Sequence, residues 1–174
     1  MEDTLSREEL AQLRTSTSLT ETQLQRLYKR FRTFDKKGTG VILKENLGCV
    51  PALASNPLVD RVLAVMTSEG QTGVRFADFA KAVSVLDSHA GREEKLRFTF
   101  KMYDMDNDGK ISNKDLYETL RIMVGVNLTG VQLQQIVDKT FIEVDADRDG
   151  FINFEEFEAL AANSDFGDRL NLHV

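Results

Sequence analysis

The sequence predicts an all-α fold of four helix-loop-helix units, arranged as two paired lobes with short β bridges between the paired loops. Two twelve-residue windows, 104–115 and 145–156, align on acidic residues, a glycine and an aliphatic residue. Two weaker windows, 35–46 and 67–78, align with them on the aliphatic position. Beside the windows, apolar residues recur at spacings of three and four, which is typical of one face of a helix. A helix is therefore expected on each side of every loop.

The helix before the first loop is predicted by a regular apolar stripe, formed by Leu24, Leu27, Tyr28, Phe31 and Phe34. Thr20 followed by Gln23 predicts a capping box at its start, in which each side chain accepts a hydrogen bond from the other residue's backbone N–H. Ser6 and Glu9 have the same spacing. They predict an additional short helix ahead of the first unit.

The remaining helices are predicted by similar signals. Before the second loop, Asn56 is expected to cap a helix with Pro57 at its first position, where the missing N–H of proline costs nothing. Thr129 with Gln132 is expected to cap the helix that enters the fourth loop. Apolar stripes beside the third and fourth loops include Leu96, Phe100, Tyr103, Leu116, Leu120, Met123, Leu133, Ile136, Val137, Phe141, Phe154, Phe157 and Leu160.

A polar, glycine-containing segment at 87–92 predicts the junction between the two lobes. One helix-loop-helix unit cannot bury its apolar face alone, so the units are expected to pair. The eighth residues of paired loops are expected to meet in an antiparallel bridge, Ile42 with Val74 and Ile111 with Ile152. The predicted divisions are an N-terminal extension, an N-terminal pair, a C-terminal pair and a tail, at 1–19, 20–88, 89–164 and 165–174.

The fourth loop matches a calcium site at every position. Calcium takes about six to eight oxygen ligands, and a loop of this kind offers them at positions one, three, five, seven, nine and twelve. Position seven uses its carbonyl and position nine acts through water. Gly150 at position six permits the sharp turn. The predicted ligands are Asp145, Asp147, Asp149, the carbonyl of Phe151, Asn153 and Glu156.

The third loop has the same pattern except at position twelve. Its predicted ligands are Asp104, Asp106, Asp108, the carbonyl of Lys110, Ser112 and Asp115. Asp115 is one methylene shorter than Glu156, so it is expected to reach the metal with a single oxygen. A lower coordination number approaches the octahedral geometry that magnesium prefers. Two calcium ions are therefore expected, with weaker calcium binding and magnesium competition at the third loop.

The first and second loops depart from this pattern. Lys37 stands at position three of the first loop, and an ammonium group inside the ligand shell would repel a divalent cation. The second loop has Thr72 where the turn glycine belongs. Neither loop is expected to bind calcium, and both are interpreted as structural.

Composition excludes several classes of function. The net charge of −6 argues against a nucleic-acid binder or a protein that binds anionic membranes. No apolar run approaches the roughly 20 residues that span a bilayer, so no membrane insertion is expected and the cytoplasm is the expected location. The two histidines, His89 and His173, lie in a junction and a tail without a nucleophile-base arrangement, so the protein is not expected to be an enzyme.

Four such loops indicate the EF-hand superfamily, and particular segments resemble calcineurin B: residues 56–59, 95–106, 123–128 and 132–140. Calcineurin B is the regulatory subunit of a calcium- and calmodulin-dependent serine/threonine phosphatase. The resemblance implies that this chain clasps an amphipathic helix of a catalytic subunit in an apolar groove. Family members commonly retain ligands in all four loops, with the first two the better candidates for signalling and the last two more structural. The loss of the first two sites here therefore implies that the remaining metals are fixed scaffolding.

One departure concerns the N-terminus. Family members usually begin Met-Gly and carry a myristoyl group, whereas Met1-Glu2 offers no glycine for that reaction. No N-myristoyl anchor is therefore expected.

Two alternative functions stay open. The segments 24–31 and 123–127 also resemble the calcineurin-B-homologous adaptors of sodium/proton exchangers. That group carries an insertion between its second and third hands, for which the short 87–92 connection leaves no room. The other alternative is a calcium buffer. The loss of two sites with retention of their helices favours an adaptor over a buffer.

Overall fold

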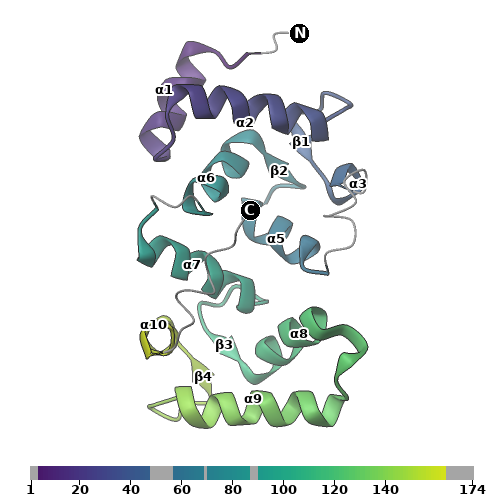
Figure 1. The fold of residues 1–174 in the computed structure, drawn as a ribbon, viewed down its shortest axis with the longest axis vertical. Helices are drawn as coiled ribbons and strands as arrows, with labels where there is room; N and C mark the ends of the chain where they lie inside the picture. The colour runs from purple at the N-terminus through teal and green to yellow at the C-terminus, as the bar shows by residue number, and fades with distance from the viewer. Residues whose placement is uncertain (1–3, 48–56, 69, 87–89, 164–174) are drawn as a thin grey trace. The chain divides into compact units, whose positions relative to one another are not determined.

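The computed structural model describes residues 4–47, 57–68, 70–86 and 90–163 (Figure 1). The chain divides into two compact units, Met1–Gly91 and Arg92–Val174. Over these described residues, each unit is helical and contains one two-stranded antiparallel sheet. The predicted all-α class, with paired helix-loop-helix units joined by short β bridges, is confirmed. No helix in the described part of the chain is long and apolar enough to cross a bilayer.

The first unit holds the two loops that lack a full ligand set. Its strands pair antiparallel, with Ile42 opposite Val74, so the predicted bridge is confirmed. Its described elements are α1 Arg7–Ser16, α2 Glu21–Phe34, β1 Val41–Ile42, α3 Lys44–Leu47, α5 Val59–Met66, β2 Val74–Arg75 and α6 Phe76–Leu86.

The helix starts in this unit follow local hydrogen bonding. Ser6 and Thr20 form the predicted capping boxes of α1 and α2. The predicted helix start at Pro57 is wrong, since α5 begins at Val59. Its first backbone hydrogen bond runs from the Val62 N–H to the Leu58 carbonyl at 2.9 Å. Pro57 lies in the preceding turn, and Asn56 lies outside the described residues.

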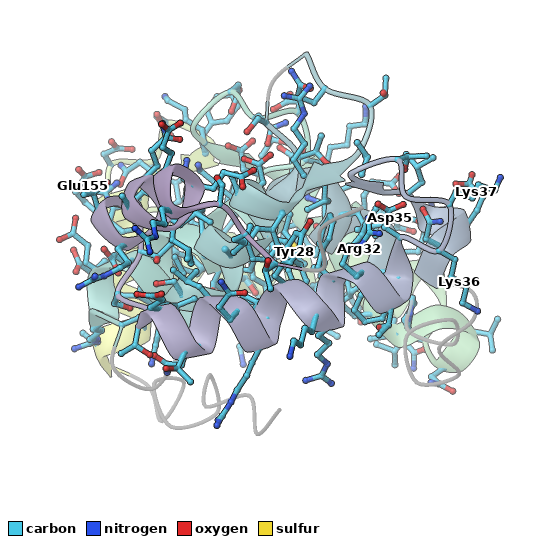
Figure 2. All side chains as sticks on the ribbon, turned by 90° about the horizontal axis from the view of Figure 1, so that it is seen from above. Tyr28, Arg32, Asp35, Lys36, Lys37 and Glu155 are labelled. Carbon is cyan, nitrogen blue, oxygen red and sulfur yellow. The ribbon has the colours of Figure 1, made fainter. Side chains whose placement is uncertain are left out.

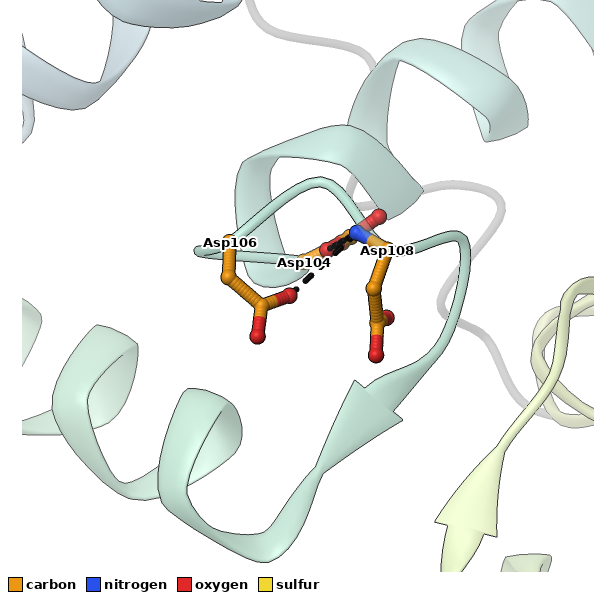
Figure 3. Close-up of side chains that lie close together, drawn as sticks. All are labelled: Asp104, Asp106 and Asp108. Carbon is orange, nitrogen blue, oxygen red and sulfur yellow. Dashed lines mark hydrogen bonds between the residues drawn. The ribbon is translucent and has the colours of Figure 1, made fainter.

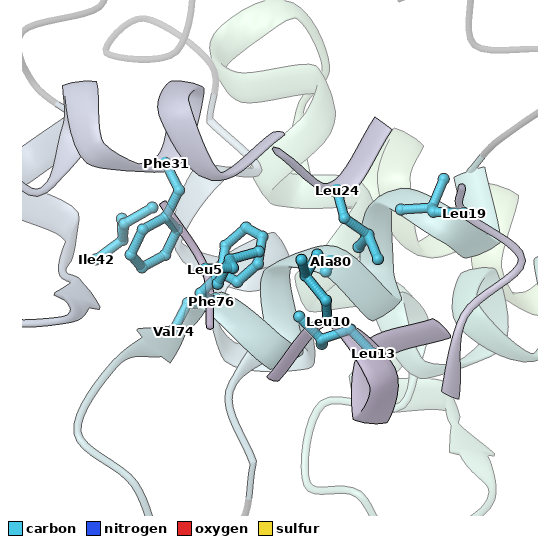
Figure 4. Close-up of a cluster of buried hydrophobic side chains, with 10 residues drawn as sticks. All are labelled: Leu5, Leu10, Leu13, Leu19, Leu24, Phe31, Ile42, Val74, Phe76 and Ala80. Atoms are coloured by element: carbon cyan, nitrogen blue, oxygen red, sulfur yellow. The ribbon is translucent and has the colours of Figure 1, made fainter. Parts of the chain in front are cut away.

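The core of the first unit includes α1 as a full member (Figure 4). Phe31 on α2 is 1% exposed, and its ring meets the Phe76 ring edge-on with centroids 5.4 Å apart. Leu10 and Leu13 of α1 join the same cluster. The N-terminal extension therefore helps to bury the apolar face of the pair. The buried cluster is Leu5, Leu10, Leu13, Leu19, Leu24, Phe31, Ile42, Val74, Phe76 and Ala80.

The second unit repeats the plan. The Phe100 ring stands edge-on to those of Phe154 and Phe157, with centroids 5.6 and 5.5 Å apart. Ile111 lies opposite Ile152, so the second predicted bridge is also confirmed. The elements are α7 Arg92–Tyr103, β3 Ile111–Ser112, α8 Asn113–Val124, the 3₁₀ turn η1 Gly125–Asn127, α9 Gly130–Val144, β4 Phe151–Ile152 and α10 Phe154–Asn163.

Phe31→Ala is expected to destabilise the first unit by about 3–5 kcal/mol, because it removes a buried ring and leaves a cavity between α2 and α6. Urea unfolding followed at amide resonances of α2 and α6 measures this loss. Lys29→Ala, an exposed change on the same helix, is the matched control. A loss below about 1 kcal/mol would show that the core does not depend on this ring.

Candidate metal sites

The third loop gathers three carboxylates at the end of α7. Oxygens of Asp104, Asp106 and Asp108 all lie within 4.8 Å of one another (Figure 3). Asp104 is 3% exposed and shapes the loop, since its Oδ1 accepts the Asp108 N–H at 3.2 Å and its Oδ2 accepts the Gly109 N–H at 3.0 Å. Carboxylate oxygens clustered in this way suit a hard divalent cation.

Burial affects the electrostatics of this cluster. It raises the pKa of Asp104 above the ordinary value, and this effect outweighs the N–H groups of Gly109, Asn107 and Asp108, which lower it. The charged form of Asp104 is therefore costly in the free loop. A bound cation would offset that cost.

The twelfth position of the third loop is occupied differently from that of the fourth. Asp115 is buried, and its Oδ2 accepts hydrogen bonds from the Ser112 N–H at 2.9 Å and from the Ser112 hydroxyl. The Asp115 N–H donates in turn to the Ser112 hydroxyl oxygen at 3.1 Å, which completes the capping box at the start of α8. The described acidic cluster of the loop does not include Asp115. Asp115 therefore serves the helix start without joining the described acidic cluster.

The fourth loop gathers Asp145, Asp147 and Glu156, again within 4.8 Å. Glu156 reaches back from α10, and its Oε1 accepts the Ala146 N–H at 2.8 Å. Its Oε2 accepts the Asn153 N–H at 3.0 Å. The carboxylate of Glu156, on a side chain one methylene longer than that of Asp115, thus lies within the acidic cluster of its loop.

The fourth loop also contains a buried polar atom without a partner. Asp145 Oδ1 is buried and takes part in no hydrogen bond within the described structure, whereas Oδ2 accepts the Gly150 N–H at 3.0 Å. Buried polar atoms are normally satisfied, so such an atom indicates a missing partner. A cation held by the loop would supply it. The residues present therefore fit the group that the loop pattern implies.

Asp149, the fifth-position ligand predicted for the fourth loop, does not belong to this cluster of described residues. Its Oδ2 accepts a hydrogen bond from Lys110 Nζ at 2.9 Å. This bond raises the pKa of Lys110 and lowers that of Asp149. From the sequence, only the carbonyl of Lys110 is predicted to take part in a metal site, that of the third loop. No local pattern signals that its side chain reaches the other loop.

The first loop holds its shape with its own hydrogen bonds. Asp35 is 2% exposed, and its Oδ1 accepts the Thr39 N–H at 2.8 Å and the Thr39 hydroxyl at 3.1 Å. Its Oδ2 accepts the Gly40 N–H at 2.6 Å. The Arg32 guanidinium lies 3.9 Å from the same oxygen. The carboxylate is therefore satisfied by the chain itself.

The position of Lys37 differs from the expectation. Lys36 and Lys37 extend outward from the loop, away from Asp35 (Figure 2). Lys37 is exposed, so its ammonium group is not inside the loop. Lys37 nevertheless supplies no oxygen at position three.

The second loop is built around different glycines. Gly70 and Gly73 have positive φ angles of 76° and 135°. A Cβ at Gly73 would lie 2.6 Å from Val41 Cγ1, so this glycine permits close approach to the strand of the first loop. Asp78, at position twelve, accepts a hydrogen bond from the Ser68 hydroxyl at 2.6 Å. Glu69 lies outside the described residues.

Comparison with known proteins agrees with this arrangement. A family model described as an EF-hand domain pair matches residues 93–162. Calcineurin B of Naegleria gruberi is 43% identical over 167 residues, which cover 96% of this chain and 94% of that protein. Calcineurin B type 1 of Dictyostelium discoideum is 42% identical over 92% of this chain and 89% of its own length. Calcineurin B of Schizosaccharomyces pombe is 44% identical over 90% of each chain.

Asp35→Ala is expected to lower the free energy of unfolding of the first unit by about 1–3 kcal/mol at pH 7, because the N–H groups of Thr39 and Gly40 lose their acceptor. Urea unfolding measures this loss. Glu45→Ala, an exposed acidic residue in the same unit, controls for the change in charge. Equal losses in the two variants would show that the Asp35 hydrogen bonds add nothing.

The same pair of proteins tests the pH dependence. Burial alone would raise the pKa of Asp35, but the Gly40 and Thr39 donors and Arg32 hold it below the ordinary value. A lowered pKa stabilises the fold above the unfolded-state value of about 3.9, and this contribution disappears as pH falls through the folded-state pKa. The difference between wild type and Asp35→Ala should shrink below about pH 4. A difference that grows in acid would contradict the assignment.

Proposed function

Because this chain belongs to the calcineurin B family, we propose that it is a calcium-binding regulatory subunit that clasps an amphipathic helix of a calcineurin-type serine/threonine phosphatase catalytic subunit in the cytoplasm. The observation that carries this proposal is the likeness to calcineurin B, which runs through both units. A regulatory subunit of this kind contributes binding and positioning, and the chemistry belongs to its partner.

Two calcium ions are proposed, one in each loop of the second unit. The acidic clusters and the unpartnered Asp145 Oδ1 support this number, since the described part of the first unit has no comparable cluster. Magnesium is proposed to compete in the third loop, where Asp115 is engaged at the start of α8. The proposed ligands are Asp104, Asp106, Asp108, Lys110, Ser112 and Asp115 in one loop, and Asp145, Asp147, Asp149, Phe151, Asn153 and Glu156 in the other.

Exposed apolar side chains on the second unit support a protein partner. Val126 is 100% exposed and Ile142 is 84% exposed, although both are large and apolar. Apolar surface of this kind favours association, and an amphipathic helix is a common partner of EF-hand proteins. The exposed large apolar residues of this segment, which runs from the end of α8 through α9, are Met123, Val126, Val131, Ile136 and Ile142.

The partner is tested by mixing the purified chain with the catalytic subunit of a calcineurin-type phosphatase from the same cells. We expect a stable one-to-one complex by gel filtration with light scattering, both in calcium and in chelator, because the metals are proposed as scaffolding. A peptide spanning the helix that binds calcineurin-B-homologous adaptors in a sodium/proton exchanger serves as the competitor. Binding to this peptide alone would favour the exchanger adaptor, and binding to neither would favour a buffer.

Glu156→Gln is expected to weaken calcium binding in the fourth loop by about tenfold or more, because it removes the charge and one oxygen of a proposed ligand that spans the loop. Isothermal titration calorimetry on the full chain measures both sites. Glu155→Gln removes the same charge from the exposed neighbouring residue and should leave both sites intact. Equal effects of the two variants would exclude Glu156 as a ligand.

Asp115→Glu is expected to strengthen calcium binding in the third loop and to reduce competition by magnesium, since the longer side chain can offer both oxygens. Calcium titrations in the absence and presence of millimolar magnesium, followed at the Gly109 amide, measure both effects. An unchanged or weakened site would show that the capping role of Asp115 determines the affinity instead.

A further inference from the structure

Lys110 takes part in both loops of the second unit. Its main-chain carbonyl stands at position seven of the third loop, whereas its side chain reaches the fourth. The Nζ atom lies 2.9 Å from Asp149 Oδ2 and 4.9 Å from the centre of the Phe151 ring. One residue therefore connects the third loop to a predicted ligand of the fourth.

The β bridge brings these groups together. Ser112 pairs with Phe151 and Ile111 with Ile152, so the two loops run side by side in opposite directions. Lys110 and Phe151 occupy the same position, seven, in their respective loops. The face of the aromatic ring attracts the ammonium group, and the carboxylate of Asp149 forms a charge-assisted hydrogen bond with it.

The two fifth-position aspartates differ in whether they join the acidic cluster of their loop. Asp108 in the third loop accepts the Lys110 N–H at 2.8 Å, and Asp149 in the fourth accepts the Phe151 N–H at 2.8 Å. Their backbone bonds are thus equivalent. Asp108 nevertheless joins its acidic cluster, whereas Asp149, bonded to Lys110, does not join the cluster of the fourth loop within the described structure.

We propose that Lys110 is a positioning residue that sets the metal affinity of the fourth loop by holding Asp149 away from the other carboxylates. This inference rests on the proposed calcium site in that loop. A cation that recruits Asp149 must compete with the ammonium group for its carboxylate, and the positive charge of Lys110 also opposes a second cation nearby. The side chains of Lys110 and Asp149 are 45% and 38% exposed, so salt weakens both effects.

The test is a calcium titration of the full chain in which the Gly109 and Gly150 amide resonances report on the third and fourth loops separately. Lys110→Met keeps a long, unbranched side chain and removes the positive charge. At low salt it should tighten calcium binding at the fourth loop by about three- to tenfold, and the gain should decrease in high salt. Lys110→Arg retains the charge and should stay close to wild type.

Lys114→Met is the matched control. Lys114 is exposed and lies at position eleven of the third loop. The structure describes every residue of the fourth loop, and Lys114 forms no ion pair with any of them. Its removal changes the net charge by the same amount as removal of Lys110. A smaller gain in Lys114→Met than in Lys110→Met supports the inference, because general charge then does not explain the effect.

Two failures can be distinguished. If wild-type protein shows no calcium-dependent change at Gly150, the proposed calcium site fails and the inference fails with it. If wild type binds calcium but Lys110→Met and Lys114→Met change its affinity equally or not at all, only the inference is overturned. A gain that is unaffected by salt would also overturn it, since the proposed mechanism is electrostatic.

Discussion

Three of the four loops are each closed by the same type of hydrogen bond. In each of them, the N–H of the glycine at position six donates to the carboxylate at position one. Asp35 accepts from Gly40 at 2.6 Å, Asp104 from Gly109 at 3.0 Å and Asp145 from Gly150 at 3.0 Å. The bond closes the turn directly after a helix, at a backbone angle that glycine tolerates. Each glycine stands two residues before the bridging residue, so the same bond aligns the strands that pair the loops.

These loops differ in which other groups interact with the carboxylate at position one. In the first loop, Thr39 and Arg32 complete the environment of Asp35, so the chain supplies every partner. In the fourth loop, Asp145 keeps one buried oxygen without a partner. Burial of Asp104 in the third loop similarly favours a compensating cation. The same loop geometry therefore gives either a structural loop, whose carboxylate is satisfied by the chain, or a loop suited to bind a cation.

A pair of hands with incomplete ligand sets needs another source of stability, and α1 contributes to it. Leu10 and Leu13 enter the core of the first unit, and the Ser18 N–H donates to the buried Ser84 hydroxyl at 3.0 Å. The first hand thus gains apolar contacts beyond those of its partner hand. These contacts are compatible with a scaffold that does not depend on metal in its first two loops.

Features that arise from neighbouring residues could be predicted from the sequence alone. The capping boxes at Ser6 and Thr20 are of this kind. The bridging pairs Ile42–Val74 and Ile111–Ile152 join residues far apart in the chain, but the repeated loop pattern places each of them at position eight. Such features follow from short-range hydrogen bonding and residue spacing, which a linear pattern records. The predicted ligand positions likewise came from spacing within each loop.

Only the tertiary structure decided where several long or hydrogen-bonding side chains point. In the fold, Lys37 turns outward, Asp115 belongs to the start of α8 and Lys110 crosses to Asp149. The last contact joins residues 39 positions apart. Its existence depends on strand register and on side-chain reach, because neither end of the pair carries a local signal of the other.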